Sequence, residues 1–319
     1  MRIRIRFTTR QLLIAVVIAG IGFSVVAKAR IHTAHEQGAV DHIVRAGGEV
    51  ISIRNARNGI LSWPLRFWDY LTRGVPSDRF AVVHFTQGRL TDERLEALNS
   101  LGVNLSLSLT NTDAADLSRL SACRSLTQIV IDACPPPDDR VGAIPPLGTL
   151  HSVIIRNGTI SAQNVNDLAG CPELSQLMLL YCKANGTERL DFASMTKLRD
   201  LRIYGNPHET ADLVKALGQC RGLEHLALRH LDLTMDDARH IAEIGSIRSL
   251  DLIGTTILDG DMTVFCRTNL RNLYVAEGQL TAMELTKFEQ RLPQCSIDRI
   301  QGYEMVRKEV SGKAAVKTD

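Results

Sequence analysis

The sequence predicts an α/β solenoid, a stack of about nine strand–turn–helix repeats that share one parallel, concave sheet. Short stretches such as HLAL (225–228) and QLML (176–179) recur along the chain, each with an apolar residue at its centre, called here the anchor. The repeat length is regular, because the anchors follow one another in steps of 22, 24, 24, 24, 24, 25, 24 and 23 residues. A fixed period of this size is typical of stacked units that bury one continuous core. The nine anchors are Val83, Leu105, Ile129, Val153, Leu177, Leu201, Leu226, Leu250 and Leu273.

Further apolar residues keep the same register and predict the rest of each repeat. Leu233 and Leu280 lie seven residues after their anchors, and Val165 and Leu168 lie twelve and fifteen after theirs. We therefore expect a short strand, a turn and a short helix or helical turn in each repeat. The segment CPPPDDRVGAIPP (134–146) departs from this pattern, because its prolines exclude a regular helix. We expect an extended connection there, on the convex side.

The N-terminus has the pattern of a membrane segment. Four arginines (2, 4, 6 and 10) precede an uncharged run from Leu12 to Ala27. A helix of this length spans about 24 Å, and flanking Arg10 and Lys28 can snorkel to reach the roughly 30 Å of a bilayer core. The arginines favour a signal anchor with a cytoplasmic N-terminus and the repeats on the extracytoplasmic side. Cleavage of a signal peptide at Ala27-Lys28-Ala29 is the alternative, and the chain is exported in either case.

The charge distribution argues against nucleic acid as a partner. The first thirty residues contain six Lys and Arg and no acid, and subtracting them from 37 leaves 31 basic against 35 acidic residues. The rest of the chain therefore carries a net charge of −4 and shows no basic stripe.

These features together resemble a known family. The pattern L-x-x-L-x-L with a 24-residue step resembles leucine-rich repeats, and LTDERLEALNSL (90–101) resembles the variant with a V-T-D-x-G-L-x-x-L segment after the strand. With a basic N-terminus and one membrane helix, the chain is similar to membrane-anchored leucine-rich-repeat proteins common in planctomycete bacteria. AVDHIVRAGGEVISI (39–53) resembles the group's helix, Gly-Gly turn and strand before the repeats, and WPLRFWDYLTRGVPSDRF (63–80) its linking segment. The resemblance implies a horseshoe-shaped binding scaffold without catalytic residues.

Four regions follow from these assignments. Residues 1–30 form the cytoplasmic segment and the transmembrane helix, 31–79 the capping and linking segment, 80–295 the repeats, and 296–319 a C-terminal cap strand and a flexible tail. An aromatic cluster in the second region either caps the open core of the first repeat or rests on the membrane surface. The cluster consists of Trp63, Phe67, Trp68 and Tyr70.

The seven cysteines are predicted to be mostly buried free thiols. Cys123, Cys171 and Cys220 each lie six residues before an anchor, where other repeats place Leu147, Met195 and Ile244. Cys134 and Cys182 share a register two repeats apart, roughly 10 Å at about 4.8 Å per strand, which is too far for a disulfide. The oxidation state of Cys266 and Cys295 stays open.

No motif in the sequence indicates catalysis, a cofactor or a metal. The chain contains no G-x-S-x-G elbow, Walker loop, H-E-x-x-H helix or C-x-x-C pair. His225, His230 and His240 fall on strand, turn and helix of one repeat, so we expect them to be solvated or packed rather than metal ligands. An enzyme with an unrecognised site would need a convergent acid, base and nucleophile, which the rows of exposed residues do not offer.

The concave face offers a candidate protein-binding surface. Residues one before, one after and three after each anchor alternate away from the core. In the middle repeats these positions hold apolar residues beside arginine and tyrosine, a composition typical of protein interfaces. The candidate residues are Val130, Ile154, Arg156, Met178, Leu180, Arg202, Tyr204, His225 and Arg229. We expect a non-enzymatic, membrane-anchored protein that binds a protein partner here; the alternative is a cell-envelope scaffold that self-associates.

Overall fold

The computed structural model describes residues 37–55, 79–85, 90–110, 114–132, 141–184, 192–205 and 220–301, together with Val214 and Leu217. The chain divides into two compact units, Met1–Val83 with Thr91–Leu105, and His84–Leu90 with Ser106–Asp319. The predicted membrane segment, the aromatic cluster at 63–70 and Cys134 lie outside the described residues. Within them, no helix has the length and apolar character needed to cross a membrane.

The first unit contains the helix, turn and strand that the sequence predicts before the repeats. Residues 37–45 are helical, the chain turns at Gly47 with φ of 78°, and β1 (Glu49–Asn55) follows. Strand β2 (Arg79–Phe85) comes next, and α3 (Asp92–Ser100) begins after Thr91, whose side chain caps the helix by accepting a hydrogen bond from the Arg94 N–H. The Arg94 Nε donates to the Ala46 carbonyl at 2.8 Å and so joins α3 to the turn.

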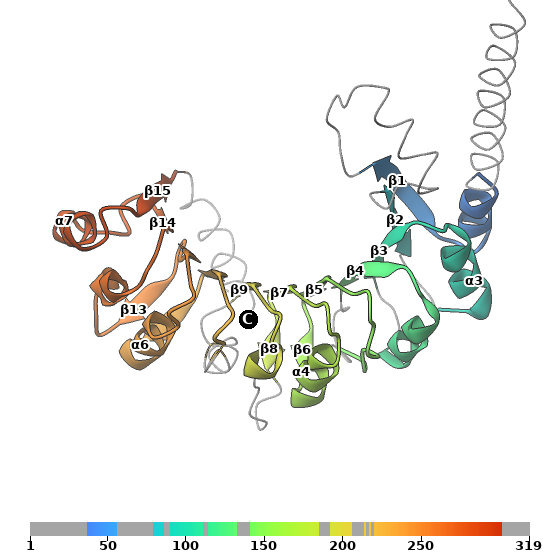
Figure 1. The fold of residues 1–319 in the computed structure, drawn as a ribbon, viewed down its shortest axis with the longest axis horizontal. Helices are drawn as coiled ribbons and strands as arrows, with labels where there is room; N and C mark the ends of the chain where they lie inside the picture. The colour runs from blue at the N-terminus through green and yellow to red at the C-terminus, as the bar shows by residue number, and fades with distance from the viewer. Residues whose placement is uncertain are drawn as a thin grey trace, which may run out of the picture. The chain divides into compact units, whose positions relative to one another are not determined.

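The second unit is built on a sheet of short strands that lie side by side (Figure 1). From β4 to β15, each strand pairs in parallel with the next, and the pairing joins anchor to anchor. Ile129 lies opposite Val153, Val153 opposite Leu177, and so on to Leu273. This register confirms the predicted repeat. In order, the strands are β3 (Asn104–Thr110), β4 (Leu126–Asp132), β5 (Ser152–Arg156), β7 (Gln176–Leu180), β9 (Asp200–Tyr204), β10 (His225–Arg229), β12 (Ser249–Asp251), β14 (Asn272–Ala276) and β15 (Ser296–Ile300).

Strand β15 continues the series by one repeat beyond the nine anchors found in the sequence. Its Ile297 pairs opposite Leu273 and holds the tenth equivalent position. Ile297 and its neighbours are only partly buried or exposed, because no further described strand pairs with the outer edge of β15. The apolar pattern by which the anchors are recognised is therefore weakest at this last copy.

The return segments vary more than the strands. Among the described residues of this unit, α4 (Ala162–Ala169), α6 (Met235–Ala242) and α7 (Ala282–Arg291) are α-helices, and η1 (Ala114–Ala122), η2 (Phe192–Ser194) and η3 (Met262–Arg267) are 3₁₀ helices. Residues 141–147 form neither helix nor strand, as the prolines of this segment predict. Figure 1 shows α4 and α6 on the opposite side of the unit from the edge along which β5, β7 and β9 run. Two short parallel pairs accompany the helices, β6 (Thr159–Ile160) with β8 (Lys183–Ala184), and β11 (Asp232–Thr234) with β13 (Thr256–Leu258).

The anchors form the centre of the core. All nine have at most 1% of their surface exposed, and full burial of each such side chain contributes about 1.5–3 kcal/mol. Among the described cysteines, Cys123, Cys171, Cys182 and Cys220 are buried free thiols, whereas Cys266 and Cys295 are half-buried and also free. The predicted core positions of Cys123, Cys171 and Cys220 are thus confirmed.

The ends of the strands share one backbone feature. The residue four positions after the anchor adopts a left-handed conformation in four repeats, with φ of 55° at Asn157, 56° at Tyr181, 62° at His230 and 70° at Gly254. Glycine and asparagine tolerate this conformation, while a bulky aromatic side chain such as that of Tyr181 does so at a cost. The position ends the strand and turns the chain toward the return segment.

Candidate functional site

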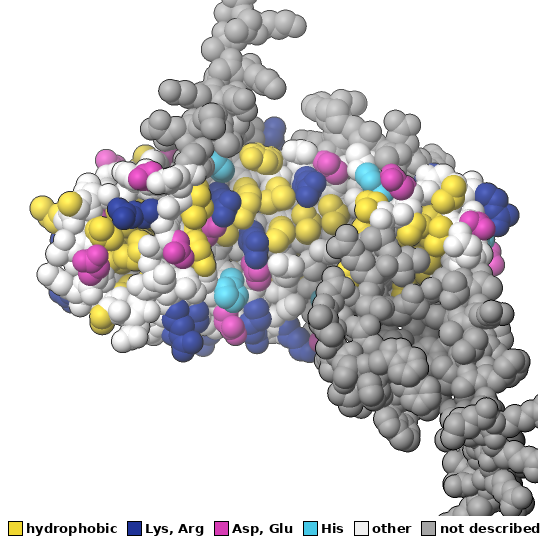
Figure 2. Space-filling view, turned by 90° about the horizontal axis from the view of Figure 1, so that it is seen from above, with side chains coloured by type: hydrophobic (Ala, Val, Ile, Leu, Met, Phe, Trp, Pro, Cys, Tyr) yellow, Lys and Arg dark blue, Asp and Glu magenta, His cyan; other side chains and the backbone are white. Residues whose placement is uncertain are grey.

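The surface of interest is the sheet face, formed by the side chains one before, one after and three after each anchor from β4 to β14. Residues one after the anchor form a continuous row, because the register sets Val130 opposite Ile154 and Ile154 opposite Met178. Neighbouring strands lie about 4.8 Å apart, and all three of these side chains are half-buried. Hydrophobic side chains gather in a band along the middle of this face, with charged side chains beside them (Figure 2).

A second row adds to this band. Three residues after the anchor, the register places Arg156 opposite Leu180 and Leu180 opposite Tyr204. Leu180 and Tyr204 are half-buried and Arg156 is exposed. We call Val130, Ile154, Met178 and Leu180 the apolar band. It covers three neighbouring strands, β4, β5 and β7.

Polar side chains at the start of the strands form a hydrogen-bonded ladder. The Ser106 hydroxyl donates to Gln128 Oε1 at 2.8 Å, and Gln128 Nε2 donates to Ser152 Oγ at 3.4 Å. The Ser152 hydroxyl then donates to Gln176 Oε1 at 2.9 Å, and Gln176 Nε2 donates to Asp200 Oδ2 at 3.1 Å. The ladder fixes these side chains across β3 to β9 and ends on the carboxylate of Asp200.

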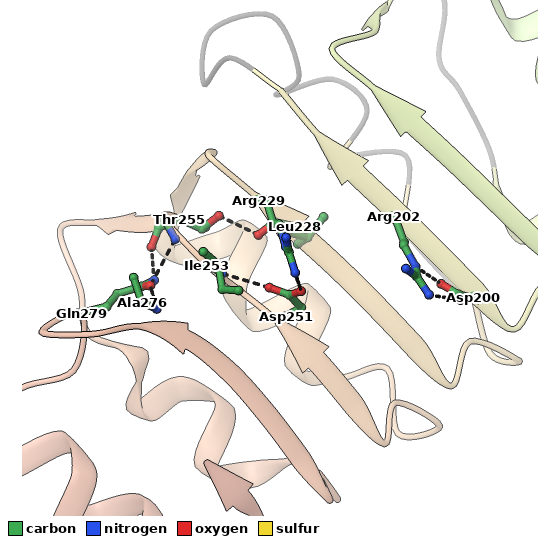
Figure 3. A network of polar contacts seen from close by, with 10 residues as sticks. Asp200, Arg202, Leu228, Arg229, Asp251, Ile253, Thr255, Ala276 and Gln279 are labelled. Atoms are coloured by element: carbon green, nitrogen blue, oxygen red, sulfur yellow. Dashed lines mark hydrogen bonds and ion pairs between the residues drawn. The ribbon is translucent and has the colours of Figure 1, made fainter. Parts of the chain in front are cut away.

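At Asp200 the face changes from apolar to charged. Arg202 binds Asp200 with two hydrogen bonds, Nε to Oδ1 at 3.0 Å and Nη2 to Oδ2 at 2.8 Å (Figure 3). Arg229 reaches across to the next strand, where its Nε donates to Asp251 Oδ2 at 2.8 Å. The other oxygen of Asp251 accepts the N–H of Ile253 at 3.1 Å. The positive charge of each guanidinium is therefore balanced by a carboxylate, and each arginine side chain is held in place.

The two arginines are tied together through Tyr204. The guanidinium carbon of Arg229 lies 4.9 Å from the centroid of the Tyr204 ring, within the range of a cation–π contact. The hydrogen bonds to Asp200 raise the pKa of Arg202 above its ordinary value. Burial alone would lower the pKa of Arg229, but the hydrogen bond and charge of Asp251 outweigh it, so this pKa is also raised. Both side chains stay charged at any physiological pH.

These side chains surround an open hollow of about 350 Å³, here called the polar hollow. Ala227 lies between Arg202 on β9 and Asp251 on β12 in the same row, so its small side chain leaves the space that larger residues fill in the band. The lining residues are Asp200, Arg202, Tyr204, His225, Leu226, Ala227, Arg229, Ser249, Asp251, Asn272 and Tyr274.

A polar cluster at the strand ends holds the strands beneath the hollow in position (Figure 3). The Thr255 hydroxyl, which is fully buried, donates to the Leu228 carbonyl at 2.7 Å. Gln279 Nε2 donates to the carbonyls of Leu252 and Thr255, both at 2.7 Å, and its Oε1 accepts from Ala276 N at 2.8 Å. This cluster joins β10, β12 and β14 by side chains that face inward, so its role is structural.

The nine residues predicted from the sequence fall into two groups on this face. Val130, Ile154, Met178 and Leu180 form the apolar band with exposed Arg156 beside them, while Arg202, Tyr204, His225 and Arg229 line the polar hollow. The prediction omitted the other lining residues of the hollow, which are Asp200, Leu226, Ala227, Ser249, Asp251, Asn272 and Tyr274. For Ala227 a signal is present in the sequence, since from β4 to β14 it is the one small residue among the large or charged residues of its row.

Among the described residues, no group of three or more His, Cys, Asp or Glu could hold a metal.

No protein-family model matches the chain, and no curated protein matches it. One solved structure with a similar arrangement is an internalin from Listeria monocytogenes, with 15% sequence identity, a TM-score of 0.36, and coverage of 68% of this chain and 73% of that one. The assignment of the solenoid depends on the strand register and not on this likeness.

Proposed function

We propose that this protein is a non-enzymatic binding protein of the leucine-rich-repeat type, which recognises a protein partner through its sheet face. The observation that carries the proposal is the apolar band. The strand register places three apolar residues, Val130, Ile154 and Met178, opposite one another on neighbouring strands, at positions that alternate away from the core. Protein interfaces typically combine an apolar centre with a polar rim, and they are enriched in methionine, tyrosine and arginine.

The charged residues beside the band support binding rather than catalysis. Asp200 and Asp251 are each bound by an arginine, an arrangement that fixes side chains in place instead of leaving a carboxylate to accept a proton. Arg202, Tyr204 and Arg229 are therefore positioned to form the polar rim of the interface. Side chains that are ordered before binding lose less conformational entropy when the partner arrives.

We further propose that residues 12–27 anchor the chain, with the N-terminus in the cytoplasm and the repeats outside. The proposal rests on the sequence alone, namely sixteen uncharged residues preceded by Arg2, Arg4, Arg6 and Arg10. Protease added to intact cells should digest the repeats, and the chain should stay in the membrane pellet after carbonate washing. Release by carbonate as a shortened chain would support the cleaved signal peptide instead.

Site-specific photo-crosslinking tests the binding surface. A benzophenone amino acid replaces Met178 in the full chain, expressed in the cells that normally produce it, and the same residue replaces Met283 in a matched control. Met283 lies on α7 and is 70% exposed, so it is more accessible than Met178 but lies outside the band. The proposal predicts one discrete protein adduct from position 178 and none from 283. Equal adducts from both positions would contradict it, and adducts only to a second copy of the chain would favour the self-associating scaffold.

A further inference from the structure

The polar hollow has a chemistry that the apolar band lacks, because it presents both charges in equal number. Its lining holds two arginines and two aspartates, so it is formally neutral when His225 is neutral. The pairs Arg202–Asp200 and Arg229–Asp251 hold these groups rigidly. A ligand in the hollow thus meets donors and acceptors side by side, in a fixed arrangement.

A neutral polyhydroxyl ligand suits this arrangement better than an ion does. A hydroxyl group donates one hydrogen bond and accepts others, and can therefore use an arginine N–H and an aspartate oxygen of the same pair. An anionic ligand would face Asp200 and Asp251, and a cationic one would face both arginines. A charged ligand would also have to give up its hydration for a site with no net charge to offset the loss.

The remaining lining completes a site for a sugar ring. Ser249 and Asn272 supply small polar groups on neighbouring strands, and Tyr204 and Tyr274 supply half-buried aromatic rings. A sugar ring has one apolar face of C–H groups, which packs on aromatic carbon while its hydroxyls remain hydrogen-bonded. A volume of about 350 Å³ lies at the small end of ligand sites, a size suited to one or two sugar rings.

We propose that the polar hollow is a binding site for a neutral saccharide unit, seated over Ala227 between Arg202 and Asp251. The hollow lies beside the apolar band, and its residues Arg202, Tyr204 and Arg229 are also the proposed rim of the protein surface. Because the hollow is open rather than enclosed, a single unit binds weakly, with a Kd of roughly millimolar order. Several units of a glycan chain would bind more tightly only through contacts outside the hollow.

The test uses the full chain, purified in a polyoxyethylene detergent so that no sugar headgroup competes. Saturation-transfer NMR and titration measure the binding of four neutral disaccharides, cellobiose, maltose, lactose and N,N′-diacetylchitobiose. The proposal predicts saturable binding of at least one of them. Ala227→Met places in the hollow the same side chain that Met178 has at the equivalent position two strands away. It should weaken that binding at least about tenfold.

Two further variants separate loss of the site from loss of the fold. Asn272→Ala removes one polar group without touching either ion pair, and should weaken binding several-fold with an unchanged circular dichroism spectrum. Ile154→Met introduces the same methionine into the band and should leave disaccharide affinity unchanged.

Three results would overturn the proposal. The first is that none of the four disaccharides binds at tens of millimolar. The second is that Ala227→Met, folded as judged by circular dichroism, binds as well as the natural chain. The third is that hexaglutamate or hexalysine binds more tightly than every disaccharide and is lost in Ala227→Met, which would identify the hollow as a peptide site.

Discussion

The apolar band and the polar hollow occupy the same positions of successive repeats, yet they are built on different principles. The band consists of Val130, Ile154, Met178 and Leu180, half-buried side chains that contribute carbon surface to the sheet face. The hollow consists of residues that hold one another, as in the pairs Arg202–Asp200 and Arg229–Asp251. The comparison shows that the repeat determines the position of each outward side chain but not its chemical type. The core is formed by the inward residues that alternate with them, so the outward ones are free to vary.

The largest effect is expected where both regions depend on one residue. Leu201 is the anchor of β9, fully buried, and its strand lies between the band on β7 and the rest of the hollow. Leu201→Ala leaves a cavity and should lower the free energy of unfolding by about 2–5 kcal/mol, as measured by urea denaturation. Arg202→Ala, the outward neighbour, provides the comparison. Equal losses for the two variants would mean that the core is not where the register places it.

Thiol labelling should distinguish the repeats that carry the band from the C-terminal end of the array by rate. Burial raises the pKa of Cys182 to about 12 and that of Cys123 to about 11, and both lie in the repeats that carry the band. Because only the thiolate reacts with an alkylating reagent, these two thiols should be alkylated at pH 8 only when the surrounding structure opens locally. Cys266 and Cys295, which are half-buried, should react at least about a hundredfold faster. Mass spectrometry after timed alkylation gives the order, and early labelling of Cys182 would show that the band repeats open first.

A smaller effect is expected from breaking one pair in the hollow. Asp251→Ala leaves Arg229 without its carboxylate and the Ile253 N–H without its acceptor, at a cost of about 1–3 kcal/mol. Asp251→Asn keeps an oxygen for the N–H and should cost less. Met178→Ala, in the band, should change stability by no more than about 0.5 kcal/mol. A larger loss of unfolding free energy for Met178→Ala than for Asp251→Ala would contradict this prediction, because the band would then contribute more to stability than the ion pair in the hollow.

The smallest effect concerns Tyr181, which follows Leu180 of the band. It has φ of 56° and is 44% exposed, whereas the equivalent position one repeat earlier holds Asn157 with φ of 55°. Tyr181→Asn should therefore stabilise the fold by about 1 kcal/mol, seen as a higher Tm. The reciprocal Asn157→Tyr should destabilise it by a similar amount. A lower Tm for Tyr181→Asn would show that contacts of the tyrosine ring stabilise the fold by more than the left-handed backbone conformation destabilises it.

The strands could be predicted from the sequence because their spacing is a direct consequence of stacking. Each anchor must lie opposite the next, so a step of about 24 residues fixes both the strand and its register. The last strand, β15, lies within the predicted C-terminal cap strand, but Ile297 was not recognised as a tenth anchor, because this strand is only partly buried at the end of the sheet. The kind of return helix was not predictable from the apolar spacing, which predicts only a short helix or a helical turn. An N-cap does not decide it either, since Ser161 caps the α-helix α4 and Asp261 caps the 3₁₀ helix η3.

The band was predictable for the same reason as the strands, whereas the side-chain pairs that form the hollow were not, although Arg202, Tyr204, His225 and Arg229 were predicted to face outward. The alternation of outward residues places Val130, Ile154 and Met178 in one row without knowledge of side-chain conformation. Arg229 and Asp251 belong to different rows, and their contact depends on the arginine reaching diagonally across the strands. A sequence shows which residues face outward, but the conformations that pair them depend on packing against neighbours such as Tyr204.

The most direct test of this account is a reciprocal measurement on two variants of the full chain. Met178→Asp places a charge in the apolar band, and Ala227→Met fills the polar hollow. In each variant, the photo-crosslinked adduct formed from a benzophenone at position 154 is measured together with the affinity for the disaccharide that binds the natural chain. The account predicts that Met178→Asp loses the adduct and keeps the sugar, and that Ala227→Met does the opposite. Loss of both activities in both folded variants would contradict it, because the two regions would then be one site.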